Sequence, residues 1–270
     1  MYKRLIPALL FAILLSLTSA HSQRQAPPLT RQDTLRGSIT PEREWWDLTF
    51  YHLSLLTNPA DSSLNGKVLI RYNVLEEYDL MQIDLQPPMR ITKITQDNKK
   101  LEFEQDGNAW FARLDKDQVP GESNEIVVSY EGKPKVSIRP PWDDGLTWSY
   151  DENDNPFYAT ACQGGGASIW WPCKDHMYDE PDSMRMTITT PGDLMNVSNG
   201  RLRGMKENKN GTKTWDWYVS NPINNYGVNI NVGDYVHFDE TYKGELGKLD
   251  VDYYVLSYNL KKAKEQFKQV

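Results

Sequence analysis

The sequence predicts an all-β fold in which antiparallel sheets pack face to face as a sandwich. Three observations lead to this prediction: apolar and polar residues alternate over many short runs, turn-forming pairs separate several of these runs, and no helical period lies between them. Strands joined without crossover helices pair antiparallel, and two such sheets bury their apolar faces against each other. About 230 structured residues are enough for a substantial core.

Each predicted strand has one apolar face, because successive side chains of an extended chain point to opposite sides. Val68, Ile70 and Tyr72, for example, alternate with polar neighbours. In chain order, the predicted strands cover residues 48–55, 68–74, 81–85, 101–103, 110–114, 126–130, 184–188, 215–219, 228–232 and 249–255. Tight turns are predicted at the Asn-Gly, Asp-Gly and Pro-Gly pairs of residues 65–66, 106–107, 120–121, 199–200 and 210–211.

The start of the chain predicts export. Residues 1–20 combine a short basic start, an apolar run and a small-residue cleavage site, which is the pattern of a cleavable signal peptide. We therefore expect a periplasmic or extracellular protein, without stable membrane insertion because the apolar run is too short to span a bilayer. Residues 21–44 are polar, contain Pro27-Pro28 and lack periodicity, which predicts a flexible lead-in.

The β domain is predicted to extend over residues 45–258 and to be followed by a helix. Asn259 can serve as its N-cap, and Leu260, Ala263 and Phe267 recur at helical spacing. No glycine, proline or polar tail ends this pattern. We therefore expect residues 259–270 to be the start of a truncated helix.

Charge and cysteine content narrow the classes of partner. The chain has 30 basic and 37 acidic residues and a net charge of -7, which argues against nucleic acid as a partner. Its two cysteines do not make a disulfide scaffold. Cys162 and Cys173 could pair in an oxidising compartment, but a glycine-rich loop need not bring their Cα atoms to bridging distance.

Residues 162–181 have the composition of a loop that takes part in function, with glycines, tryptophans, both cysteines and several acidic residues close together. Glycines at 164–166 permit tight turns and close approach to a ligand, and polar groups beside such a loop are candidates for binding. Trp170 and Trp171 are expected to fill the core rather than bind sugar. The acidic residues near this segment are expected to be solvated, namely Asp143, Asp144, Asp175, Asp179, Glu180 and Asp182.

Two other interpretations of this region stay open. Cys162, Cys173 and His176 could bind a metal, because Cys173 and His176 have the Cys-x-x-His spacing that occurs in structural zinc sites, although a closed tetrahedral site needs a fourth ligand. The chain could also be a stand-alone secreted binding or adhesion module that uses exposed aromatic residues.

Three groups of motifs carry a family resemblance. They are Leu64-Asn65-Gly66-Lys67-Val68 with Ile83-Asp84-Leu85 and Ile91, then Cys162-Gln163-Gly164 with Trp171-Pro172-Cys173-Lys174-Asp175-His176 and Asp179-Glu180-Pro181, and finally Asn221-Pro222-Ile223-Asn224-Asn225-Tyr226-Gly227 with Val232-Gly233-Asp234-Tyr235. Together they resemble the saddle-like amino-terminal β domain of the aminopeptidase N family of zinc metallopeptidases.

The resemblance implies an enzyme that removes amino-terminal residues from peptides and binds zinc through His-Glu-x-x-His and a later Glu. That chemistry needs two histidines one helical turn apart. None of the four histidines here precedes a Glu. We therefore expect no catalytic or zinc-binding residue in this chain, an inactive isolated chain, and zinc in a missing catalytic domain of the same polypeptide.

The resemblance also implies a substrate contact. Gln163, directly after Cys162, matches the family's Gln or Glu that contacts the amino-terminal residue of the peptide, and Gly164 and Gly165 would let the substrate approach. An amide offers two donors and an acceptor without titrating. The expected partner is thus the amino terminus of a peptide substrate, which Gln163 would attract less strongly than a carboxylate would.

Overall fold

The structure is a computed structural model and describes residues 28–269. The signal peptide predicted at 1–20 and the beginning of the lead-in lie outside the described residues. The chain divides into two units between Thr34 and Leu35. In the first unit, the Thr30 backbone N–H donates to Asp33 Oδ2 at 2.7 Å and the Asp33 N–H donates to Thr30 Oγ1 at 3.2 Å. This reciprocal pair is a capping box that starts helix α2 (Arg31–Gly37).

The described part of the predicted lead-in contains helical turns. Helix α2 is followed by α3 (Pro41–Glu44). Both helices are too short to be stable from local propensity alone. Leu35 and Arg43 are buried, and the Arg43 side chain forms an ion pair with Asp84. Tertiary contacts therefore stabilise the turns around Arg43, which explains why the sequence pattern showed no periodicity there.

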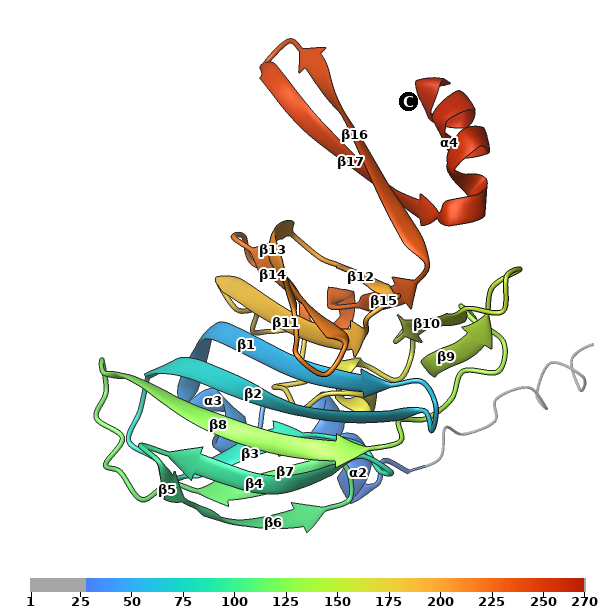
Figure 1. The fold of residues 1–270 in the computed structure, drawn as a ribbon. Helices are drawn as coiled ribbons and strands as arrows, with labels where there is room; N and C mark the ends of the chain where they lie inside the picture. Colours follow the sequence, from blue (N-terminus) through green and yellow to red (C-terminus); the bar gives the residue numbers. More distant parts are fainter. Residues whose placement is uncertain (1–27, 270) are drawn as a thin grey trace, which may run out of the picture. The chain divides into compact units, whose positions relative to one another are not determined.

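A sheet of eight strands forms one layer of the second unit (Figure 1). Across the sheet the strands are β13 (Arg201–Glu207), β14 (Thr212–Val219), β11 (Ser183–Pro191), β1 (Trp46–Asn58), β2 (Ser63–Val74), β8 (Ser123–Gly132), β4 (Arg90–Gln96) and β5 (Lys99–Lys100).

One neighbouring pair in this sheet is parallel rather than antiparallel. Strand β1 pairs with β11 in parallel, with Phe50 opposite Ser183 and Leu55 opposite Ile188. The other strand pairs within residues 28–269 are antiparallel, and one isolated bridge, between Val136 and Leu146, is also parallel. A parallel pair needs a long crossover. Here the chain between Asn58 and Ser183 provides it, so turn signals could not have revealed this neighbour relation.

Two smaller sheets and a hairpin complete the fold. The three-stranded sheet has the order β3 (Leu80–Asp84), β7 (Ala109–Arg113) and β6 (Glu102–Asp106). The four-stranded sheet has the order β12 (Met195–Ser198), β15 (Ile230–Gly233), β10 (Pro156–Ala161) and β9 (Gly145–Tyr150). Strands β16 (Tyr235–Gly244) and β17 (Gly247–Leu256) form the hairpin, and the single-turn helices η2 (Ala167–Ile169) and η3 (Asn225–Gly227) lie in loops.

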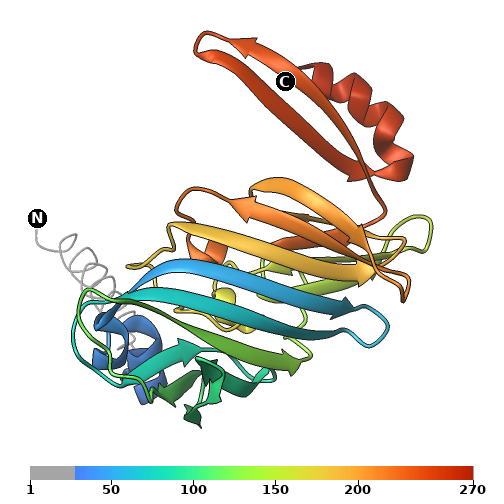
Figure 2. The ribbon, with the colours of Figure 1, turned by 60° about the vertical axis from the view of Figure 1, so that its left-hand side comes forward.

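The core lies between the inner face of the large sheet and the two smaller sheets. Inward side chains of the large sheet, such as Ile70 and Met186, belong to the same buried cluster as Ile83 of β3, Leu146 of β9 and Ile230 of β15. Figure 2 shows the layers from a second direction. The predicted all-β sandwich is confirmed. The strands that the sequence pattern missed, such as β13 and β16, are largely exposed on both sides and so carry no alternation.

The predicted helix near the end of the chain is also confirmed. A single turn, η4 (Ser257–Asn259), leads into α4 (Leu260–Gln266), which η5 (Phe267–Gln269) extends. The Phe267 ring lies 4.9 Å from the ring of Tyr253 in β17, so the helix packs on the hairpin. Within residues 28–269, no helix combines the length and apolar character needed to cross a membrane.

Candidate functional site

Gln163 lies at the exposed tip of the loop between β10 and η2. Gly164 beside it is also exposed, whereas Gly165 is buried. The Tyr226 hydroxyl donates a hydrogen bond of 2.9 Å to Gln163 Oε1, which fixes the orientation of the amide. A carbonyl oxygen has two lone pairs, so Oε1 keeps one for a further donor, and Nε2 carries two N–H groups. The side chain can therefore donate and accept at once.

Long-range hydrogen bonds hold the backbone of this loop. The Gly164 N–H donates to Asp144 Oδ1 at 2.6 Å, and the Gly164 carbonyl accepts from Arg36 Nη2 at 2.6 Å. The Gly165 carbonyl accepts from Gln86 Nε2, also at 2.6 Å. These partners come from three separate parts of the chain. The backbone that carries Gln163 is therefore fixed by long-range hydrogen bonds and is not a freely moving turn.

Asp143 and Asp144 lie half-exposed in the irregular loop before β9, and both carboxylates also make hydrogen bonds that the sequence did not predict. Asp144 binds Gly164, as described above. Asp143 accepts hydrogen bonds from Ser137 Oγ at 2.6 Å and from the Ile138 N–H at 2.7 Å. The Ser137 hydrogen bond is the main cause that lowers the pKa of Asp143. These two carboxylates organise the loop before β9 and connect it to the loop of Gln163.

Asp175 and Gly166 fix the far end of the same loop. Gly166 has φ +83°, and a Cβ atom there would lie 2.4 Å from Asp175 Oδ2, so both conformation and space require glycine. The Asp175 carboxylate accepts from the N–H groups of Ala167 at 3.3 Å and Ser168 at 3.0 Å. Asp175 is therefore not the solvated acid that the sequence predicted.

A buried ion pair supports the segment that follows. Lys174 Nζ lies 2.5 Å from Asp179 Oδ2, donates to the Trp46 carbonyl at 2.6 Å, and sits 4.0 Å from the Trp46 ring centre. Both side chains are nearly inaccessible to solvent, so the prediction of a solvated Asp179 is also wrong, whereas Glu180 and Asp182 are exposed.

Burial opposes the charge of both partners. It lowers the pKa of Lys174 to about 8, and the Asp179 carboxylate only partly offsets this. It also raises the pKa of Asp179 despite the nearby ammonium group. In a second pair, Arg43 Nη2 lies 2.6 Å from Asp84 Oδ2, and burial raises the pKa of Asp84. At these carboxyl groups the cost of desolvation exceeds the attraction of the basic partner. Removing one partner would leave the other charge buried without compensation, which is strongly destabilising.

The three motif groups noted in the sequence meet at this site. Asp84 and Cys173 exchange backbone hydrogen bonds of 2.8 and 3.1 Å. Asn225 Nδ2 donates to the Lys174 carbonyl, and its neighbour Tyr226 binds Gln163. Segments that are far apart in the sequence therefore form one unit around the Gln163 loop.

The tryptophans and cysteines of this region are buried. Trp170 and Trp171 are fully inaccessible, as predicted for core residues. Cys162 and Cys173 are both free thiols. His176 Nε2 lies 3.2 Å from the Gly37 carbonyl. Among residues 28–269, no three His, Cys, Asp or Glu side chains come together as a set of metal ligands.

Both thiols should resist modification in the folded protein. Burial raises the pKa of Cys162 to about 12 and raises that of Cys173 as well. Since the thiolate is the reactive form, we expect a disulfide-exchange reagent such as DTNB to label neither thiol at about pH 8. Without any reductant, denaturation in guanidinium should release two reactive thiols. If denaturation released none, the two cysteines would instead be joined as a disulfide.

The sequence and the fold were compared with those of known proteins. The family model described as "Peptidase M1 N-terminal domain" matches residues 48–226. No curated protein matches the sequence. A mutant M1 zinc metallopeptidase from Deinococcus radiodurans, solved with a Tyr-Ser-Ala substrate, has a TM-score of 0.69 and 18% identity over 83% of this chain and 51% of its own.

Two further solved structures give a similar result. A two-domain M1 zinc metallopeptidase mutant bound to L-arginine has a TM-score of 0.69 and 19% identity, again over 83% of this chain and 51% of its own. The M1 zinc metallopeptidase from Deinococcus radiodurans has a TM-score of 0.64 and 20% identity over 79% and 47%. This chain therefore spans about half the length of these relatives, and the likeness extends over most of the fold.

Proposed function

Since this chain belongs to the family of peptidase M1 N-terminal domains, we propose that it forms the non-catalytic wall of the substrate cleft in a zinc metallo-aminopeptidase. In this proposal, Gln163 contacts the amino-terminal residue of a peptide, beside the backbone of Gly164 and Gly165. The single observation that supports it best is the exposed Gln163 amide, oriented by Tyr226 on a loop that is braced from both sides.

Gln163 has the chemistry for a peptide amino terminus. The free lone pair of Oε1 can accept an N–H of the substrate ammonium group, and Nε2 can donate to the first carbonyl oxygen. A hydrogen bond to a charged group contributes about 1.5–3 kcal/mol. Because an amide does not titrate, this contact would persist over the whole working pH range. Gly165 is buried and its carbonyl is occupied by Gln86, so its role in the proposal is to shape the loop.

The zinc ion of the proposed enzyme would be held outside this chain. The described residues offer no set of ligands that fits it. Zinc would polarise the peptide carbonyl and activate water in a catalytic domain of the same polypeptide, while this chain orients the substrate. The export suggested by residues 1–20 belongs to the same proposal, and cell fractionation of the complete gene product tests it.

The function is tested with the complete gene product and with this chain alone. The complete protein should contain about one zinc ion per molecule and hydrolyse alanine p-nitroanilide, but not the N-acetylated substrate, because recognition needs a free amine. This chain alone should hydrolyse neither. Zinc-dependent hydrolysis by the isolated chain, or equal cleavage of the acetylated substrate, would contradict the proposal.

A further inference from the structure

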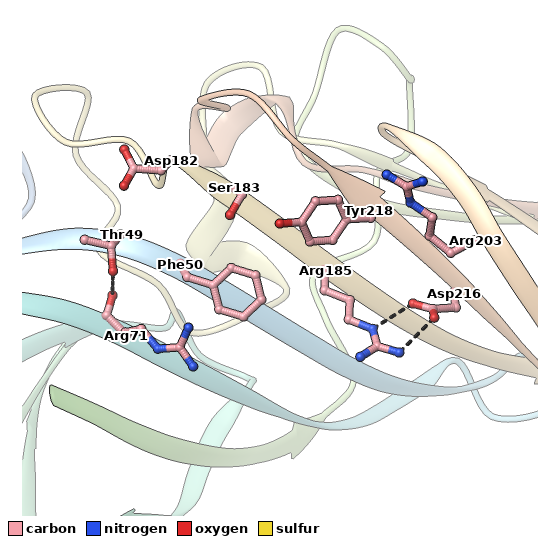
Figure 3. A pocket seen from close by; sticks show the side chains of 9 residues that line it. All are labelled: Thr49, Phe50, Arg71, Asp182, Ser183, Arg185, Arg203, Asp216 and Tyr218. Carbon is pink, nitrogen blue, oxygen red and sulfur yellow. Dashed lines mark hydrogen bonds and ion pairs between the residues drawn. The ribbon is translucent and has the colours of Figure 1, made fainter. Parts of the chain in front are cut away.

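A groove of 710 Å³ crosses the outer face of the large sheet, which faces away from the core (Figure 3). It is lined by side chains from β2, β1, β11, β14 and β13, so it runs across the strands and not along them. Phe50 and Tyr218 lie near its middle, with Arg71, Arg185 and Arg203 around them. The residues of the Gln163 loop take no part in its lining.

Two β-bulges shape this groove. The pairing of β1 with β2 shifts between Leu48 and Phe50, so Thr49 is an extra residue. As a result Thr49 and Phe50 both line the groove, although Leu48 before them and Tyr51 after them are buried in the core. A bulge costs ladder hydrogen bonds and re-aims a side chain, and bulges are frequent beside functional sites.

The second bulge lies at the other end of the groove. The pairing of β13 with β14 shifts between Leu202 and Gly204, which makes Arg203 the extra residue. Arg203 then reaches over the ring of Tyr218, with its guanidinium carbon 5.5 Å from the ring centre. Two separate bulges in one sheet thus bring side chains into the same groove. A sheet face that only contacts solvent would need neither bulge.

Two of the three arginines that line the groove are paired with carboxylates. Arg185 binds Asp216 through two hydrogen bonds of 2.9 and 2.8 Å, and Arg71 Nη2 lies 3.1 Å from Glu125 Oε2. Asp182 also lines the groove, at the opposite end from Arg203 (Figure 3). The lining therefore holds three guanidinium groups and two carboxylates, and Glu125 beside it pairs with Arg71. Because two of the three guanidinium groups are paired, an anion such as phosphate or nucleic acid would find no strong net attraction.

The position of the groove also argues against an extended peptide. Strands β1, β2, β11 and β14, which carry most of the lining residues, are each paired on both sides, so the middle of the groove has no open edge for the addition of another strand. Only β13, at the end of the groove, is an edge strand. What the groove offers is aromatic surface, the hydroxyl groups of Thr49, Ser183 and Tyr218, and the N–H groups and carboxylate oxygens of the Arg185–Asp216 pair. These groups suit a neutral ligand that has many hydroxyls and an apolar C–H face.

We propose that this groove binds a neutral oligosaccharide. One sugar ring would stack on the face of Phe50 opposite the Arg71 guanidinium, which lies 5.3 Å from the ring centre. The hydroxyl groups of the sugar would hydrogen bond with the Arg185–Asp216 pair and with Tyr218. The volume of the groove suits a ligand of about two or three sugar units. This binding activity is independent of the peptidase function proposed above.

The test uses this chain and three neutral probes: cellotriose, maltotriose and triacetylchitotriose. Saturation-transfer NMR should detect at least one of them, and titration calorimetry should give a dissociation constant below about 1 mM. Phe50→Ala should weaken that binding about tenfold, because it removes the stacking surface. Leu69→Ala is the matched control: it changes a half-buried apolar residue of the neighbouring strand outside the groove lining, and binding should be unchanged.

A second variant tests the proposal even if Phe50→Ala fails to fold. Tyr218→Phe keeps the ring and removes one hydroxyl, and it should weaken binding about threefold. Absence of binding by all three probes at about 10 mM would overturn the proposal. Equal binding by Phe50→Ala and the unchanged protein, or tighter binding of inorganic phosphate than of any neutral probe, would also overturn it. None of these outcomes depends on peptidase activity, so the two proposals can fail separately.

Discussion

Replacing Lys174 by methionine is expected to lower the free energy of unfolding by about 3–5 kcal/mol. The substitution keeps most of the side-chain volume but leaves the Asp179 carboxylate buried without its partner, 2.5 Å from where the ammonium group was. Guanidinium unfolding followed by tryptophan fluorescence measures the loss. The matched control is Arg71→Met, because the Arg71–Glu125 pair is about half exposed on both sides and should contribute less than about 1 kcal/mol.

The pH dependence of the stability of Lys174→Met shows whether the unpaired Asp179 carboxylate causes the loss. Burial raises the pKa of Asp179, and removal of Lys174 should raise it further. A group with a raised pKa in the folded state stabilises the protein at low pH, and this contribution is lost as the pH rises through that value. The deficit of Lys174→Met should therefore be smaller at about pH 4 than at about pH 7.

Removing both charges should recover most of the stability. A double variant, Lys174→Met with Asp179→Leu, leaves no buried charge in the pair and should unfold closer to the unchanged protein than the single variant does. A loss below about 1 kcal/mol in the single variant, or no recovery in the double variant, would mean that this pair does not hold the segment in place.

Replacing Gln163 by alanine in the complete gene product should lower kcat/KM for peptides with a free amino terminus about 10–100-fold. The change removes the hydrogen bonds that orient the ammonium group but touches no core residue, since Gln163 is exposed. Most of the loss should be seen in KM if the contact is equally strong in the ground state and the transition state.

Gln105→Ala provides the control for that measurement. Gln105 is an exposed glutamine of β6, in the three-stranded sheet, and its Nε2 donates to the Gly107 carbonyl. Its replacement should leave kcat/KM unchanged within about twofold. If Gln163→Ala behaved like Gln105→Ala, Gln163 would be no more than a loop residue that binds Tyr226.

Much of the fold could be predicted from the sequence, because its inner faces alternate regularly. Strands such as β2 and β11 bury every second side chain, and this pattern can be read locally. The parallel pairing of β1 with β11 could not be predicted, since it depends on what the intervening chain does. The short helices α2 and α3 were missed because Arg43 is fixed by Asp84, a partner 41 residues away.

The candidate site could be predicted only in part. The motif pointed to Gln163, but Tyr226 lies 63 residues from it, and Asp144 and Arg36 lie 20 and 128 residues from Gly164. No local pattern indicates such partners. The sequence predicts that Asp175 and Asp179 are solvated, because charged residues are mostly exposed. Their buried partners are set by the tertiary fold and leave no local pattern. The bulges that shape the groove interrupt the alternation of apolar and polar residues, and no sequence pattern of their own marks them.

The most direct test of the proposed function is a crystal structure of the complete protein with a bound tripeptide. The Gln163 amide should lie about 3 Å from the substrate's amino nitrogen or its first carbonyl oxygen, with Tyr226 still bound to Oε1. A tripeptide whose amino terminus binds elsewhere, with the Gln163 side chain in solvent and more than about 6 Å from any substrate atom, would contradict the account.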